Sequence, residues 1–404
     1  MQKWILAACS LLAVSVSMTG CGAPPQVDGF IDKNGTLVLD ASRLKPKPLG
    51  IGDYSEGLAV VKYKDGFGCL NKTGEIIFKV PFRNLRSFHD GVAAFSVGKS
   101  AADERWGYIN QKGDTVIKPA YTAAEDFSDE AAAVRLTTAA NGGKAGRWAY
   151  IDKTGTQIMK ETFEEAQPFH EGLAPVKVDG KMGCINRIGR FVVPPNYDAV
   201  YAVDHGTIVA AHGTGISGKD PDQSLEYYSQ DGSIFSRTNM QAVSLENLHP
   251  LMWCKAPPAV GAANDRPLST FVSPGFAGGK SIQQAGNKFV VPQQFDARAF
   301  SGAYDYMFPV SEGFFVAYND SAGGKMDYRG GKPTDENGIW NNHAFRFWDA
   351  APFSDGLGLV QESKGGMYGY VNASGGYALQ PIYKHARPFK DGRALVGDSA
   401  LTYP

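Results

Sequence analysis

The stretch that decides the fold of this chain spans residues 169–201 and reads FHEGLAPVKVDGKMGCINRIGRFVVPPNYDAVY. It opens with an aromatic residue, an acidic residue and a glycine, and an apolar strand follows. A short turn, a second strand and an Asx-x-x-Gly turn come next, and a third strand ends near proline. Recognisable copies begin at residues 54, 88 and 127. Periods of this length, roughly 34 to 42 residues, are typical of solenoids and propellers.

Each part of the repeat has a physical cause. Asn186, followed three residues later by Gly189, suits a turn with a side-chain cap and a left-handed residue, and such a turn closes a hairpin. The second strand alternates bulky and small positions, as a half-buried strand does. Proline cannot donate to a ladder, so we expect the third strand to end or lie at a sheet edge.

Two recurrent positions indicate where the core lies. The first strand carries a small residue at one position, namely Ala59, Ala93, Ala132, Ala174, Gly358 and Ala394. Because small side chains suit a crowded place, we expect this to be the innermost strand. The bulky position that opens the second strand exchanges one apolar side chain for another, in Phe30, Phe67, Trp106, Trp148, Met182 and Tyr368. Such exchange favours core packing over stacking on a sugar.

The second strand begins with an aromatic residue, a glycine and another aromatic residue, as in Trp106-Gly107-Tyr108 and Tyr368-Gly369-Tyr370. This pattern resembles the bacterial WG-repeat family, which is named for the Trp-Gly pair. The resemblance implies all-β repeats and an interaction role, and it implies no particular ligand. The repeats are clear in residues 54–201 and 353–396 and degenerate in residues 203–350.

The two ends of the repeat region carry complementary fragments. Residues 29–35 match the second half of a unit, and residues 389–396 match a first strand that lacks its second half. In a ring these fragments would complete one unit. We therefore predict an all-β fold of tandem three- to four-stranded β-meander repeats in a propeller-like closed ring of eight or nine units. An open β-solenoid is the alternative, because frayed caps would show the same fragments.

Residues 1–20 are expected to be a lipoprotein signal peptide. They hold Lys3, an apolar run too short to span a bilayer, and the order Met18-Thr19-Gly20 before Cys21. This order resembles a bacterial lipobox, which implies cleavage before Cys21, lipidation of its sulfur and stable anchoring by several acyl chains. A plain secretory signal with cleavage nearby is the alternative.

The lipid anchor determines the expected domain boundaries and the expected cellular location. Residues 21–28 would form a short lipidated tether, and residues 29–404 would form the WG-repeat β domain. The resemblance implies a membrane lipoprotein that faces the periplasm or lies at the cell surface. In a double-membrane bacterium, Gly22 after the cysteine favours the outer membrane.

Composition narrows the possible partners. The chain has 404 residues, and its 40 Lys and Arg residues nearly cancel 41 Asp and Glu residues. This balance argues against attraction to nucleic acid or acidic lipid as the main activity. Cys69 and Cys184 stand where tyrosine stands in other copies, which favours buried side chains, and a disulfide among Cys69, Cys184 and Cys254 stays open. Without a CxxC spacing, we expect no zinc site.

Insertions lengthen the turn between the first and second strands in several copies. They span residues 97–105, 137–147, 212–224, 255–269 and 319–337. Because they interrupt the same hairpin, they should emerge on one face, and clustered insertions mark the binding surface of many repeat proteins. The candidate binding residues in these loops are Lys99, Arg105, Lys144, Arg147, Lys219, Arg266, Tyr328 and Arg329.

The motifs that could carry catalysis are weak. The stretch GTGISGKD at residues 213–220 resembles a phosphate loop, but Asp220 replaces the hydroxyl residue that such a loop requires. Repeated acids could act as glycosidase carboxylates, but their place before the turn glycine has a simpler explanation in turn formation. They are Glu56, Asp90, Asp129, Glu171, Glu312, Asp355 and Asp391. We expect no catalytic residue, cofactor or metal.

The sequence thus predicts a non-enzymatic, lipid-anchored cell-envelope protein whose repeats form a scaffold. The expected partner is another envelope protein or cell-wall material. An envelope glycan hydrolase that uses the repeated carboxylates is the alternative. A cytosolic version of the scaffold is a third hypothesis, which would follow if Cys21→Ala left the fractionation of the chain unchanged.

Overall fold

The computed structural model describes residues 28–137, 146–202, 208–212, 224–239, 283–285, 288–290, 306–307, 314–319, 325–330 and 345–397. Within these residues the chain forms 33 β-strands and one 3-10 turn, Ala41–Arg43, and no α-helix. No helix in this part of the chain is long and apolar enough to cross a membrane. The expected signal peptide and tether, up to residue 27, lie outside the described residues.

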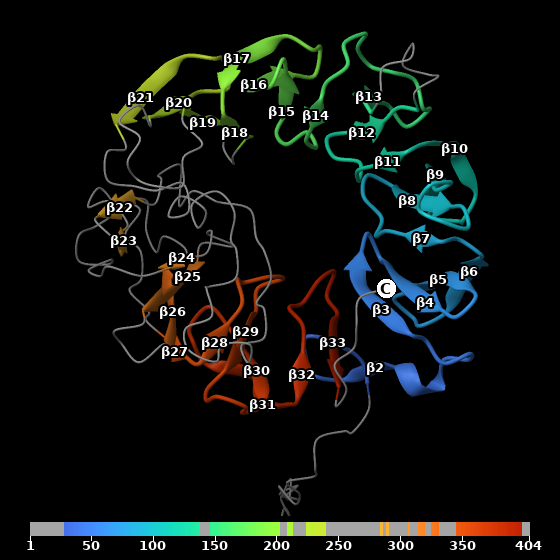
Figure 1. Ribbon diagram of the computed structural model, residues 1–404. Coiled ribbons are helices and arrows are strands. Elements are labelled where there is room, and N and C mark those ends of the chain that lie inside the picture. Colours follow the sequence, from blue (N-terminus) through green and yellow to red (C-terminus); the bar gives the residue numbers. More distant parts are fainter. Residues whose placement is uncertain are drawn as a thin grey trace, which may run out of the picture.

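The strands form nine small antiparallel sheets, which follow one another around a ring (Figure 1). We call them blades. Blade 1 holds β3 (Gly50–Ser55), β4 (Leu58–Tyr63), β5 (Gly66–Asn71) and β6 (Ile76–Val80), and blade 2 holds β7 (Asn84–Leu85), β8 (Val92–Val97), β9 (Arg105–Asn110) and β10 (Thr115–Tyr121). Blade 3 holds β11 (Ala123–Ala124), β12 (Ala132–Arg135) and β13 (Trp148–Ile151), and blade 4 holds β14 (Glu165–Ala166), β15 (Leu173–Val178), β16 (Lys181–Asn186) and β17 (Phe191–Tyr197).

The remaining blades continue the series. Blade 5 holds β18 (Ala199–Ala202), β19 (Ile208–His212), β20 (Ser224–Tyr228) and β21 (Ile234–Asn239), and blade 6 holds β22 (Gln283–Ala285) and β23 (Lys288–Val290). Blade 7 holds β24 (Tyr306–Met307), β25 (Phe314–Asn319), β26 (Lys325–Gly330) and β27 (Phe345–Phe347), and blade 8 holds β28 (Asp349–Ala350), β29 (Gly358–Gln361), β30 (Tyr368–Val371) and β31 (Tyr377–Tyr383). The closing blade holds β32 (His385–Ala386), β33 (Ala394–Gly397), β1 (Gly29–Ile31) and β2 (Leu37–Asp40).

The closing blade joins the two ends of the repeat region. Strand β1 pairs with β33, with Gly29 opposite Val396, Phe30 opposite Leu395 and Ile31 opposite Ala394. The N-terminal fragment therefore supplies two strands of a sheet whose other two strands come from the C-terminal fragment. This confirms the predicted complementarity, and the all-β fold of tandem small meanders is confirmed with it.

The prediction about the innermost strand is wrong. A further short strand lies at one edge of the sheet, as β7 does beside β8, where Asn84 faces Ser96 and Leu85 faces Phe95. In Figure 1 the strand in this position, such as β3 in blade 1, lies towards the middle of the ring, and β6 lies at its rim. Strand β7 spans only two residues, too few to show a period, so the sequence pattern did not reveal it.

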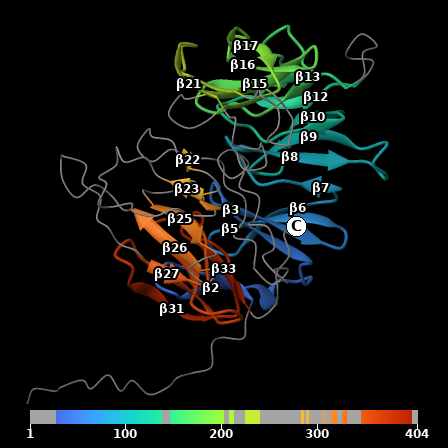
Figure 2. The same cartoon turned by 60° about the vertical axis from the view of Figure 1, so that its left-hand side comes forward.

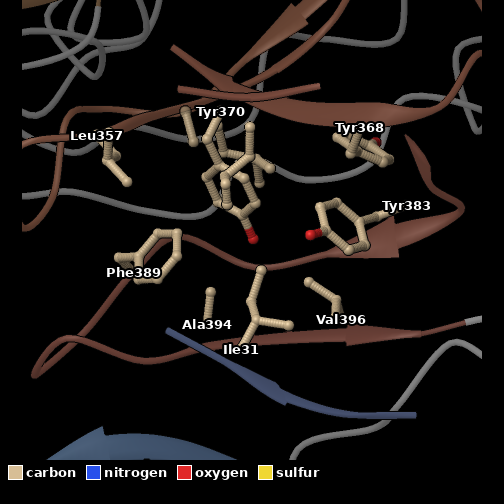
Figure 3. Close-up of a cluster of buried hydrophobic side chains, with 11 residues drawn as sticks. Ile31, Leu357, Tyr368, Tyr370, Tyr383, Phe389, Ala394 and Val396 are labelled. Carbon is tan, nitrogen blue, oxygen red and sulfur yellow. The ribbon is translucent and has the colours of Figure 1, made fainter. Parts of the chain in front are cut away.

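The core consists of clusters shared by successive blades. Between blade 8 and the closing blade, Tyr370 and Phe389 pack with Ile31 from the first strand of the chain (Figure 3). Between blades 1 and 2, Phe67 and Cys69 pack with Phe88 and neighbouring side chains. The bulky side chains thus pack in the core, as predicted. Burial of a side chain of this size contributes about 1.5 to 3 kcal/mol to the free energy of folding.

Candidate binding face

The antiparallel strand order gives the ring two different faces. In each four-stranded blade the first and third connections emerge on one face, which we call the turn face. The second connection and the link to the next blade emerge on the other, which we call the loop face. Gln111 Nε2 lies 3.2 Å from Glu56 Oε2 and joins the two kinds of turn on the turn face. Arg83 Nη1 lies 3.3 Å from the Lys99 carbonyl oxygen and joins a link to a hairpin loop on the loop face.

Figure 2 shows the loop face at blade 2, where β8 runs towards the right of the view and its hairpin loop emerges there.

The repeated acids lie on the turn face and bond to the next blade. Each of five carboxylates accepts a backbone N–H from the equivalent turn of the following blade. The N–H groups of Gly57, Gly91, Glu130, Gly172 and Gly392 donate to Asp391 (2.6 Å), Glu56 (2.9 Å), Asp90 (2.7 Å), Asp129 (2.7 Å) and Asp355 (2.6 Å) respectively. The series passes through the closing blade, because Asp355 bonds to Gly392 and Asp391 bonds to Gly57.

The local conformation explains why an acid and a glycine recur here. Asp90 has φ 53° and Gly91 has φ 83°, so both residues are left-handed. Aspartate tolerates this conformation better than most residues, and glycine adopts it without cost. The turn interpretation of the acids is therefore confirmed for the described residues, whereas Glu312 lies outside them. Each of these carboxylates belongs to a separate blade.

A second set of contacts joins the blades inside the ring. The buried hydroxyls of Tyr108, Tyr150 and Tyr370 donate to the carbonyl oxygens of Glu125 (2.7 Å), Gln167 (2.6 Å) and Arg387 (2.7 Å), each on the next blade. Cys69 and Cys184 take the tyrosine position in two copies. Both are buried free thiols, as the packing interpretation predicted, so neither forms a disulfide. Cys254 lies outside the described residues.

The hairpin loop of blade 2 is held by its own acid. Asp103 accepts the backbone N–H groups of Lys99 (2.9 Å) and Ser100 (2.5 Å). The Ser100 hydroxyl, followed by these N–H groups, holds the pKa of Asp103 well below its ordinary value. The side chains of Lys99 and Ser100 are exposed. The loop therefore has a fixed path and presents an accessible cation.

The base of this loop is tied to the blade. Glu104 Oε1 accepts from Asn84 Nδ2 and from the hydroxyl of the fully buried Ser96, each at 2.7 Å. Arg105 is the first residue of β9, and its guanidinium donates to the Glu104 carbonyl at 2.7 Å. Arg105 is half-buried and serves the loop itself, so of the two candidates in this loop, Lys99 is the one with an exposed side chain.

The other candidate residues have different outcomes. Arg147 lies before β13, and its guanidinium donates to the Thr162 carbonyl and lies 3.7 Å from Glu164, so it ties its blade together. Lys144, Lys219 and Arg266 lie outside the described residues.

One predicted loop is partly wrong. Tyr328 and Arg329 lie in β26, which pairs along its full length with β25, so the segment expected as a loop between residues 319 and 337 contains a strand. The physical reason is that its alternating bulky and polar residues can continue the hairpin ladder. Of the candidates within the described residues, Arg105 and Arg147 serve their own blades and Tyr328 and Arg329 lie in a strand, so these four do not join Lys99 in one constellation.

The sequence patterns do not predict a cluster of charged residues that lies between blades 2 and 3. Arg86 Nη1 lies 3.0 Å from Glu125 Oε2 and 3.7 Å from Asp126 Oδ1, and His89 Nε2 lies 3.8 Å from Asp126 Oδ2. The Arg86 guanidinium also lies 5.1 Å from the ring centre of Trp106. Burial raises the pKa of Asp126 above its ordinary value.

The same slot repeats at the junction of the ring. Arg387 lies 3.1 Å from Asp53, with both side chains mostly buried. The sequence does contain an indication of these pairs, because Arg86 and Arg387 occupy the same position in two copies of the repeat. These pairs join blades and do not form a cation site, and no described group of three or more metal-ligating side chains does so.

A comparison with models of protein families finds one repeat family in five places of the chain. Residues 67–99, 106–137, 148–181, 182–211 and 368–397 each match the model of the WG containing repeat. These matches coincide with the second half of one blade and the first half of the next. A comparison with curated proteins gave no match.

Solved structures show only distant likeness. A eukaryotic initiation factor is 10% identical with a TM-score of 0.35, and the match covers 78% of this chain and 69% of that one. A streptogramin B lyase is 11% identical with a TM-score of 0.30 over 83% and 95% of the two chains. The Pan2 WD40 domain of Neurospora crassa is 12% identical with a TM-score of 0.27 over 74% and 94%.

Proposed function

Because this chain is a WG-repeat protein, we propose that it is a non-enzymatic scaffold of the cell envelope, anchored to a membrane through a lipid on Cys21. Its loop face binds another envelope protein or cell-wall material. The ring supplies a rigid support, and the loops supply the contacts that select the partner.

The observation that carries this proposal is how the two faces use their polar groups. On the turn face, the repeated acids bond to the next blade, as Asp391 does to Gly57. On the loop face, the connection between the second and third strands varies from residues 179–180 in blade 4 to residues 136–147 in blade 3. Variable loops on a fixed frame are where binding residues of repeat proteins concentrate.

The glycan-hydrolase alternative has less support. It needs two carboxylates roughly 5 to 10 Å apart across a cleft that holds the sugar. The described repeat acids instead belong to separate turns, and five of them accept a backbone N–H of the next blade. No described residue favours the hydrolase over the scaffold.

The test uses cross-linking in cells that make the full chain. A photoreactive residue replaces Lys99 on the loop face or, as a matched control, Lys112 on the turn face, which is also exposed. We expect a covalent adduct with a macromolecule at position 99 and none at position 112. Equal adducts at both positions, or none at either, would contradict binding through the loop face.

A loop-shortened variant sharpens this test. Residues 98–104 are replaced by Asp-Gly, the turn that joins Val178 to Lys181 in blade 4. The cross-linker then stands at exposed Lys64, in the neighbouring hairpin turn of blade 1. We expect shortening to reduce adducts at position 64 at least tenfold if the blade 2 loop holds the partner, while the melting temperature confirms that the ring is folded. Cys21→Ala tests the anchor separately, because it should move the chain from the membrane to the soluble fraction.

A further inference from the structure

The link between the closing blade and blade 1 is unusually basic. We call residues 42–49 the basic segment. Arg43, Lys45 and Lys47 are exposed, and the Arg43 side chain keeps 85% of its accessible surface. Leu49 is 60% exposed, which is high for a large apolar side chain.

The basic segment has a fixed place on the ring. Leu44 is buried in the cluster between the closing blade and blade 1. The Leu49 N–H donates to the Lys62 carbonyl at 2.7 Å. The buried Leu44 side chain fixes the start of the segment, and the hydrogen bond of the Leu49 backbone fixes its end. The charged side chains of the segment therefore project from a defined surface of the loop face.

Nearby charges reinforce the positive sign. Lys79 Nζ lies 3.5 Å from the Lys45 carbonyl oxygen, which adds a fourth cation beside the segment. Asp40 lies 3.1 Å from Arg43 and offsets part of its charge. Lys64 and Asp65 in the adjacent hairpin turn oppose each other in sign. Cations therefore outnumber anions here, although the whole chain has a net charge of −1.

The entry of the chain lies against this segment. The carbonyl of Asp28 accepts the N–H of Ala41 at 2.8 Å, at the start of the 3-10 turn that leads into the segment. Only six residues separate Cys21 from Asp28. Even fully extended, a tether of that length reaches about 20 to 25 Å. A lipid on Cys21 would therefore hold this part of the loop face close to the membrane surface.

We propose that the basic segment rests on the anionic headgroups of the membrane that holds the lipid anchor, with Leu49 entering the interface. This inference depends on the anchoring proposed above and adds an orientation to it. Basic side chains near an anionic surface attract it within about a Debye length, and an exposed leucine gains by leaving water. The anchor and the segment together fix the tilt of the ring, because they are two neighbouring points of contact on one face.

The experiment places a polarity-sensitive fluorophore at Leu49→Cys in the full lipidated chain with Cys254→Ser. The same fluorophore at Ile188→Cys is the matched control, because Ile188 is also apolar and 78% exposed but lies in a turn of the turn face. Cys69 and Cys184 are buried and stay unlabelled. The chain is inserted into vesicles of phosphatidylethanolamine with phosphatidylglycerol, or into vesicles of phosphatidylcholine alone.

We expect a blue-shifted emission and at least threefold stronger quenching by a lipid-phase quencher at position 49 than at position 188, in the anionic vesicles only. Lys45→Glu with Lys47→Glu should abolish that difference. Lys33→Glu with Lys72→Glu, two exposed lysines of turn-face turns, should leave it intact.

Two outcomes overturn the inference in different ways. In the first outcome, the chain enters the vesicles, but the emission and quenching at position 49 equal those at position 188 or do not depend on lipid charge. In that case the proposed contact of the basic segment is wrong, and the lipid anchor is still supported. If the chain does not associate with vesicles at all, the anchor itself fails, and the contact that depends on it fails with it. An unchanged melting temperature of the glutamate variants excludes unfolding as the cause.

Discussion

The turn face and the loop face are built on the same strands but use their residues in opposite ways. On the turn face, the turns between third and fourth strands span four or five residues in six blades, as in 72–75 and 372–376, while the corresponding connection in blade 7 spans fourteen, residues 331–344. On the loop face, the hairpin connection spans two residues in blade 4 and twelve in blade 3. The difference teaches that the repeated residues of this chain maintain the ring, while its irregular residues carry what is particular to it.

The acids of the two faces show the same contrast. Asp391 accepts an N–H from blade 1 and so acts between blades. Asp103 accepts N–H groups from Lys99 and Ser100 and so acts within one loop. Removing Asp391 should therefore weaken the ring, whereas removing Asp103 should change only a local surface.

The largest effect is expected where the blades meet, at Tyr150. Its side chain is fully buried, and its hydroxyl donates to Gln167 on the next blade. Tyr150→Ala should lower the free energy of unfolding by about 3 to 5 kcal/mol, because it leaves a large cavity. Tyr150→Phe should cost about 1 kcal/mol, the value of one hydrogen bond. Urea unfolding followed by tryptophan fluorescence measures both.

A matched substitution on the loop face gives the comparison its reference. Lys99→Ala removes an exposed side chain and should change stability by less than about 0.5 kcal/mol. If Lys99→Ala and Tyr150→Ala were equally destabilising, the division between a structural seam and a free face would be wrong.

The next effect concerns the bond that crosses the ring junction. Asp391→Ala removes the acceptor for the Gly57 N–H and should cost about 1 to 2 kcal/mol, because a partly buried donor to a charged group loses its partner. Asp391→Asn keeps an acceptor oxygen and should cost less. Thermal unfolding measures the three proteins. A melting temperature unaffected by Asp391→Ala would show that the turn-face acids do not hold the blades.

Thiol reactivity tests the same seam without a stability measurement. Burial raises the pKa of Cys69 and of Cys184 to about 12, which keeps both thiols protonated at neutral pH. Only a thiolate reacts rapidly with iodoacetamide. We expect both to stay unmodified in the folded protein, while Leu49→Cys on the loop face reacts within minutes, as mass spectrometry of digests would show. Rapid labelling of Cys69 would mean that blades 1 and 2 separate readily.

The sequence predicted the parts of this molecule that repeat. The Asn186 to Gly189 turn, the pairing of the terminal fragments through Phe30 and Leu395, and the packing role of Phe67 all follow from patterns that recur in several copies. A pattern that recurs in several copies can be distinguished from features of a single copy, so its physical cause can be recognised in one sequence.

The parts that the sequence did not predict depend on few residues or on distant ones. The innermost strand β7 spans two residues and shows no period. The Arg86 and Asp126 contact joins residues 40 positions apart in different blades, so spacing alone did not suggest it. The strand around Tyr328 was taken for an insertion because its blade lacks the clear motif. Of the candidate binding residues, Lys99 retains an exposed side chain and a loop of defined shape.

The smallest expected effect distinguishes copies within the turn face. The Asx position of the turn is Asp152 in blade 3 and Asn110 in blade 2, and both accept the same backbone N–H groups. Hydrogen bonds from the Thr154 hydroxyl and from the Thr156 and Thr154 N–H groups lower the pKa of Asp152 below its ordinary value of 3.8. The stabilising contribution of the charged form is therefore present above that pH and is lost as the pH falls through the lowered pKa.

Asp152→Asn should remove this loss, because an amide does not titrate, so the melting temperature of the variant should fall less steeply as the pH falls below the ordinary carboxyl pKa of 3.8. Asn110→Asp should do the reverse and make blade 2 as sensitive to acid as blade 3. Calorimetry of the two variants and the natural chain across this range measures the difference. Parallel melting curves for all three would mean that the carboxylate and the amide cap the turn equally at every pH. The choice between Asp and Asn in the repeat would then carry no acid dependence, and the bonds of the turn face would owe their strength to geometry alone.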